Sequence, residues 1–235
     1  MLNDDEILAN LHDVRTRIDR AAAQRRHGSG DVRLLLATKT VPADRIAVVV
    51  TAGERLLGEN RVQELAQKDE YLSALPCERH LIGHLQSNKV NQALRYVTCI
   101  QSLDRVELAD RLQRRLDTLD TTVDVLLQVN TSGETSKFGV PPDEALTLAR
   151  QTAKLDRLRI QGLMTIGLPA SDADLIRPSY RRLREARDRI RDAQIDGVHM
   201  GTLSMGMSAD LDIAIDEGST MVRVGSGVFG ARPRP

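Results

Sequence analysis

The stretch RLLLATK, from Arg33 to Lys39, joins a short leucine-rich run to a lysine that follows it directly. Apolar runs of this length are typical of strands that are buried on both faces of a parallel sheet. Comparable runs recur along the chain and alternate with longer amphipathic segments. We predict eight strands, at residues 33–38, 55–58, 79–82, 97–101, 123–130, 159–165, 197–203 and 221–224.

The amphipathic segments between these runs predict helices, at residues 43–51, 61–72, 88–96, 105–119, 143–155, 174–193 and 209–216. A further helix begins near Asn3, where Glu6 completes a capping-box pattern, and it ends before Gly28. Repeated strand-helix order implies parallel strands with right-handed crossovers, and eight is the strand number of an α/β barrel. The sequence therefore predicts one (β/α)8 TIM barrel with an extra N-terminal helix, as a single domain over residues 1–235.

The composition argues against nucleic acid and membranes as binding partners. Lys plus Arg and Asp plus Glu both total 33, so the net charge is zero and does not favour nucleic acid or an acidic membrane. The first residues lack the pattern of a signal peptide, and no stretch approaches the roughly 20 apolar residues that cross a bilayer. Cys77 and Cys99 are too few for a disulfide framework. We expect a cytoplasmic protein without a nucleic-acid or membrane partner.

The ends of the predicted strands should carry the chemistry, because the sites of (β/α)8 barrels lie at the carboxyl ends of their strands. Lys39 ends the first run, and two-residue alternation directs it to the same side as Leu35 and Ala37. Partial burial disfavours an ammonium and so favours the amine that can attack an aldehyde. The alternative, an exposed lysine whose stem packs on the strand, stays open at this point.

The turns after the seventh and eighth strands predict an anion site. Ser208 follows one strand, next to a helix predicted from Ala209, and Gly225 and Ser226 follow the other. Glycines let backbone N–H groups approach an anion, serines add donors, and a helix start favours negative charge. Each segment alone is also compatible with an ordinary turn or helix cap. Arg223, inside the last strand, requires either an acceptor or an ion pair to a neighbouring strand.

Three further strand ends carry polar residues that could line the same opening. Glu59 and Asn60 follow the second strand, His84 the third and Asn130 the fifth. A lone histidine is more often structural than catalytic, so we rank His84 below Asn60.

Five segments together resemble the pyridoxal phosphate homeostasis protein family, over almost the whole chain. They are residues 37–40 (ATKT), 58–61 (GENR), 80–86 (HLIGHLQ), 203–208 (LSMGMS) and 221–225 (MVRVG). The resemblance implies a barrel similar to the N-terminal domain of alanine racemases, with pyridoxal 5′-phosphate held as a Schiff base on Lys39. It also implies that the phosphate is held by Ser208, Gly225 and Ser226, that the ring lies between Asn60 and Met207, and that Arg223 faces the pyridine nitrogen.

Two positions differ from the usual family sequence, and a third offers an additional contact. Ser226 stands where the family usually has threonine, and it keeps the hydroxyl. Val41 stands where many relatives carry a second lysine, which puts a role of that lysine in cofactor transfer in doubt here. Lys137 is a candidate for a secondary contact.

The resemblance favours a carrier over a catalyst. A guanidinium only donates hydrogen bonds, so Arg223 would keep the pyridine unprotonated and weaken it as an electron sink. Racemases with this barrel add a tyrosine from a second domain, whereas Tyr71, Tyr96 and Tyr180 fall in predicted helices, away from the barrel mouth. We therefore expect a monomer or weak dimer that stores or delivers the cofactor, transiently to apo-enzymes, without robust catalysis. A weak racemase-like enzyme and a colourless class I aldolase remain alternatives.

Overall fold

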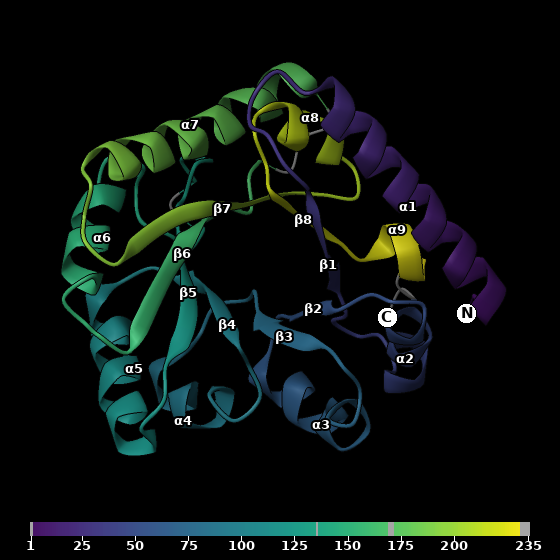
Figure 1. The fold of residues 1–235 in the computed structure, drawn as a ribbon, viewed down its shortest axis with the longest axis horizontal. Coiled ribbons are helices and arrows are strands. Elements are labelled where there is room, and N and C mark those ends of the chain that lie inside the picture. The colour runs from purple at the N-terminus through teal and green to yellow at the C-terminus, as the bar shows by residue number, and fades with distance from the viewer. Residues whose placement is uncertain (1, 135, 169–171, 231–235) are drawn as a thin grey trace.

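The computed structural model describes residues 2–134, 136–168 and 172–230, and eight parallel strands close a barrel in chain order (Figure 1). This confirms the predicted fold class. The strands are β1 (Arg33–Ala37), β2 (Leu56–Glu59), β3 (Glu78–Leu81), β4 (Cys99–Leu103), β5 (Val123–Gln128), β6 (Leu158–Met164), β7 (Val198–Met207) and β8 (Met221–Val224).

The helices form a layer outside the strands, and α1 is the predicted additional N-terminal helix. They are α1 (Asp4–Gln24), α2 (Ala43–Thr51), α3 (Val62–Leu72), α4 (Val90–Ala93), α5 (Val106–Leu119), α6 (Ala145–Thr152), α7 (Ala173–Asp192), α8 (Leu211–Asp216) and α9 (Ser226–Phe229), with a 3-10 turn η1 (Ser87–Lys89). In Figure 1, α1 lies along α8 and α9 and contacts both. Within the described ranges, no helix combines the length and hydropathy needed to cross a membrane.

Strand β1 shows how the leucine run builds two layers. Leu34 and Leu36 point outward into a buried cluster that includes Ile18 of α1. Leu35 points inward, where Gly58 of β2 leaves room for it, because a Cβ on Gly58 would lie 2.4 Å from Cδ2 of Leu35. Apolar residues at three successive positions are therefore all buried, as expected for a strand covered on both faces.

Several predicted boundaries were wrong near the carboxyl ends of the strands. Strand β7 continues to Met207 instead of ending at Leu203, because it still pairs with β8 there. Helix α8 consequently begins at Leu211, so Ser208 does not directly precede it. The four-residue helix α9 was not predicted, and the helix predicted over residues 88–96 is divided between η1 and α4.

Candidate functional site

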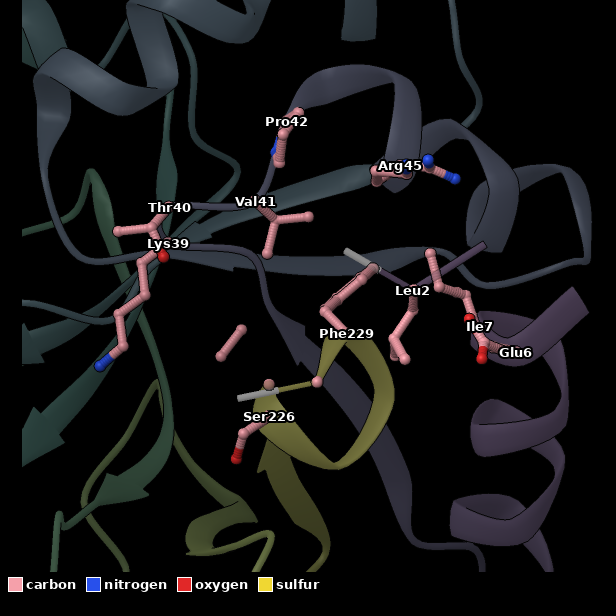
Figure 2. A pocket seen from close by; sticks show the side chains of 13 residues that line it. Leu2, Glu6, Ile7, Lys39, Thr40, Val41, Pro42, Arg45, Ser226 and Phe229 are labelled. Carbon is pink, nitrogen blue, oxygen red and sulfur yellow. The ribbon is translucent and has the colours of Figure 1, made fainter. Parts of the chain in front are cut away.

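An open cavity of about 560 Å³ lies where the ends of β1 and β8 meet the start of α1 (Figure 2). Lys39, Gly225 and Ser226 line it together. The two strands are neighbours in the barrel, with Leu36 paired to Val224, so their following turns are adjacent. In Figure 2 the Lys39 side chain extends away from Leu2 and Arg45, which line the opposite end. The structure thus brings the predicted amine and part of the predicted anion site together.

The backbone before Lys39 is fixed by a buried ion pair. The Thr38 hydroxyl donates to Oε1 of Glu59 at 2.7 Å, and the Thr38 carbonyl accepts from Nζ of Lys68 at 2.8 Å. Lys68 also donates to Oε1 of Glu59 at 2.6 Å. Lys39 therefore follows a residue, Thr38, whose side chain and carbonyl are both held in place.

The backbone after Lys39 is anchored to the same group of charges. Thr40 has a positive φ of 64°, and its N–H donates to Oε2 of Glu64 at 2.9 Å. Burial raises the pKa of Glu59 to about 7, against the opposing effect of Lys68. We call Glu59, Glu64 and Lys68 the acid-lysine cluster. The cluster was not predicted, because Glu64 and Lys68 lie on α3 and charges on a helix usually indicate a solvated face.

The turn after β7 is held by a carboxylate. The Met207 N–H donates to Oδ1 of Asp210 at 2.6 Å, and the Tyr180 hydroxyl donates to Oδ2 at 2.8 Å. Gly206 has a φ of 93°, and a Cβ there would lie 2.5 Å from Cβ of Ala214, so the turn requires glycine. Tyr180 was predicted to lie away from the mouth, but its hydroxyl supports this turn from the buried side, and burial raises its pKa.

The turns after β7 and β8 are joined to each other and braced by α1. The Ser208 hydroxyl accepts from the Gly227 N–H at 3.2 Å. From α1, Arg17 donates to the Ser208 carbonyl at 2.7 Å, and Asn10 donates to the Val228 carbonyl at 3.1 Å. The two segments that the sequence singled out as an anion site therefore form one connected structure.

Gly225 brings the turn after β8 unusually close to β1. A Cβ at this position would lie 2.9 Å from the carbonyl oxygen of Ala37. Ser226 follows as the exposed first residue of α9 and lines the cavity. A side chain at position 225 would therefore press on the backbone of Ala37, so glycine lets this turn pack against β1.

Arg223 is buried inside the barrel, 6% exposed, below these turns. It donates to Oγ of Ser204 at 2.9 Å and to the carbonyl oxygen of Thr165 at 2.7 Å. Both partners are neutral, and the alternative ion pair to a neighbouring strand is not found among the described residues. Burial lowers the pKa of this guanidinium.

The remaining predicted residues lie at other strand ends. Asn60 is partly buried after β2, where Gly83 packs so closely that a Cβ would lie 2.2 Å from the Asn60 carbonyl oxygen. The His84 ring stacks on Phe138 with centroids 3.7 Å apart, and burial lowers its pKa. Lys137 donates to the Gly167 carbonyl at 3.0 Å, so it is not an ordinary exposed lysine. None of these three residues lines the cavity of Figure 2.

Comparison with known proteins identifies the family to which this chain belongs. The model of the alanine racemase N-terminal domain matches residues 10–233. The pyridoxal phosphate homeostasis protein of Aquifex aeolicus is 41% identical, over 94% of this chain and 96% of its own length, and that of Escherichia coli is 38% identical over 97% of both. The structure of PipY from Synechococcus elongatus with PLP bound is 31% identical with a TM-score of 0.83, and the match covers 95% of this chain and 100% of PipY. The chain belongs to the pyridoxal phosphate homeostasis protein family.

Proposed function

We propose that this protein binds pyridoxal 5′-phosphate covalently through Lys39 and serves in intracellular vitamin B6 homeostasis by storing or delivering the cofactor. The observation that carries the proposal is the cavity shared by Lys39, Gly225 and Ser226 at the adjoining ends of β1 and β8. The PLP-bound structure of PipY supports the same ligand.

The turns after β7 and β8 fit a phosphate group. Ser208 and Ser226 supply hydroxyls, and the backbone of Gly225 and Gly227 is open to close approach. A Cβ on Gly225 would meet Ala37, and one on Gly227 would lie 3.3 Å from Oγ of Ser208. Glycine at both positions thus keeps the two turns packed against Ala37 and Ser208, which brings their backbones close together.

The other residues would hold and orient the rest of the cofactor. When bound, pyridoxal phosphate supplies an aldehyde and a ring that acts as an electron sink. The Lys39 amine would form a Schiff base with the aldehyde, with loss of one water, and Asn60 and Met207 would flank the ring. Arg223 would donate to the ring nitrogen and keep it unprotonated, because a guanidinium has no acceptor.

Two features favour storage and release over rapid turnover. Arg223 weakens the ring as an electron sink, and the Tyr180 hydroxyl is buried and engaged by Asp210, so it is not available as an acid at the mouth. The cavity is open, so an incoming amine can displace Lys39 and release the cofactor. We further infer a single cytoplasmic barrel unit, a monomer or weak dimer, that meets apo-enzymes transiently. The free thiols of Cys77 and Cys99 are compatible with a reducing compartment.

The test is the visible absorbance of the purified protein loaded with cofactor, followed by borohydride reduction and peptide mass spectrometry. We expect a yellow protein with the reduced adduct on Lys39, and loss of both signals in Lys39→Ala. Lys154→Ala is the matched control. Lys154 is exposed and lies in the connection between α6 and β6, at the end of the barrel opposite the cavity. An undiminished adduct in Lys39→Ala, or a colourless aldolase activity, would overturn the assignment.

Delivery is tested separately by mixing the loaded protein with an apo-enzyme that requires the cofactor. Recovery of the enzyme's activity faster than spontaneous release into buffer supports a carrier. Complete failure to transfer, together with amino-acid turnover that depends on Lys39, would favour the racemase-like alternative.

A further inference from the structure

A hydrogen-bonded chain crosses the barrel interior beneath the proposed cofactor site. Nη1 of Arg223 donates to Oγ of Ser204 at 2.9 Å, and Ser204 donates to Oε1 of Gln101 at 2.7 Å. Nε2 of Gln101 lies 2.8 Å from Nδ1 of His80. We call Arg223, Ser204, Gln101 and His80 the core chain. All four are buried, and Gln101 is 0% exposed.

The core chain spans opposite walls of the barrel. Ser204 belongs to β7 and Gln101 to β4, and these strands are separated by β5 and β6 in the sheet. The bond between them therefore crosses the interior instead of following the sheet. Barrel interiors are normally filled with branched apolar side chains, and buried polar groups are costly unless fully paired. Such a chain calls for an explanation other than packing.

Arg223 fixes the direction of every bond in the core chain. A guanidinium only donates, so the Ser204 oxygen must accept, and its own hydrogen is directed to Oε1 of Gln101. The Gln101 amide then turns its N–H groups toward Nδ1 of His80 and toward Sδ of Met221, which lies at 3.2 Å. His80 accordingly accepts at Nδ1. The amide is satisfied at both ends, so it has a single well-paired orientation.

The core chain restricts where the Arg223 guanidinium can point. One terminal nitrogen is held by Ser204 and the other by the Thr165 carbonyl, which together define the plane of the group. Ser204 can serve as a fixed acceptor only while its hydroxyl hydrogen is committed to Gln101. The orientation of Arg223 thus depends on a residue that it does not touch.

We propose that Gln101 is a positioning residue for the cofactor: through Ser204 it holds the Arg223 guanidinium toward the ring nitrogen, and His80 holds Gln101 from the other end. This inference rests on the proposed binding of pyridoxal phosphate. It extends the site from the mouth, where Lys39 acts, into the barrel interior.

Gln101→Met tests the proposal, because methionine keeps the length of the side chain and removes its strong donors and acceptor. We expect the reduced adduct on Lys39 to form as before. We also expect the visible absorbance maximum and its pH profile to shift, and the dissociation constant of pyridoxal phosphate to rise about tenfold, as for loss of one oriented hydrogen bond to a charged group. Ser102→Ala is the matched control. Ser102 is the next residue on β4 and is 0% exposed, and its hydroxyl has no hydrogen-bond partner in the described part of the chain, so its loss should change neither quantity.

Ser204→Ala provides an independent arm. It should reproduce the spectral shift of Gln101→Met, and the double variant should show no additional shift, since both changes interrupt the same chain. If Gln101→Met does not fold, the comparison of Ser204→Ala with Ser102→Ala carries the test. An unchanged spectrum and affinity in Ser204→Ala, or in a folded Gln101→Met, overturns the positioning role. Absence of a Lys39 adduct in the unsubstituted protein would instead overturn the proposed function.

Discussion

Replacing Glu59 by glutamine should remove a pH dependence of stability that arises beside the proposed site. Glu59 is 3% exposed, and desolvation raises its pKa from the ordinary 4.5 to about 7. Between these two pH values the folded protein keeps a proton that the unfolded chain loses, so the free energy of unfolding falls as pH rises. Each pKa unit is worth about 1.4 kcal/mol, so the loss approaches about 3 kcal/mol above pH 7.

The assay is urea unfolding of both proteins, without added cofactor, near pH 5 and near pH 8. Near pH 5 the neutral glutamine mimics protonated Glu59, so the two proteins should be similar. Near pH 8 the variant should be the more stable by about 3 kcal/mol. Glu64→Gln is the control within the acid-lysine cluster: the pKa of Glu64 is lowered, so its contribution is present at neutral pH and is lost as pH falls. Parallel pH dependence of Glu59→Gln and the unsubstituted protein would show that Lys68 keeps Glu59 ionised throughout, and would refute the reasoning.

Two further substitutions test the structure, one beside the site and one in the connection from α8 to β8, at the other end of the barrel. Gly206→Ala should lower the free energy of unfolding by about 2 kcal/mol, because the φ of 93° and the 2.5 Å approach to Ala214 both exclude a side chain; an unchanged urea midpoint would contradict this. Glu217→Ala should lower the free energy of unfolding by about 3 kcal/mol in the same assay. The buried carboxylate of Glu217 pairs with Arg177 at 3.1 Å and with Arg184 at 2.6 Å, and both arginines would lose this partner. A loss below about 1 kcal/mol would mean that solvent compensates the arginines.

The sequence predicted the barrel well because its strands are buried on both faces. The run of three leucines in β1 has no polar face to confuse the pattern, and the loss of apolar residues after Ala37 marks its end. The end of β7 was harder, because Ser204 and Gly206 are turn-forming types. In the structure, Ser204 is paired inside the barrel and Gly206 adopts a positive φ within the strand. Helix α9 is too short to show a helical period.

Part of the candidate site was predicted from the sequence and part was not. Lys39 and Ser226 were predicted from their position after strands and from the family motifs, and the structure places both at one cavity. The contacts that support them were not predicted. Glu59 was expected only as a residue that could line the mouth, and Gln101 lies on a short strand, where a polar residue is usually taken to face solvent. Their roles depend on which side chains meet across the barrel or from a helix beneath it, and no local pattern encodes that.

The pairing of β1 with β8 places the cavity on the seam where the barrel closes. A ribosome makes Lys39 long before it makes the turn that contains Ser226. A nascent chain therefore exposes the amine before the proposed anion-binding groups exist, and contacts so distant in sequence form late in folding. The proposed cofactor site is accordingly complete only in a chain whose barrel has closed.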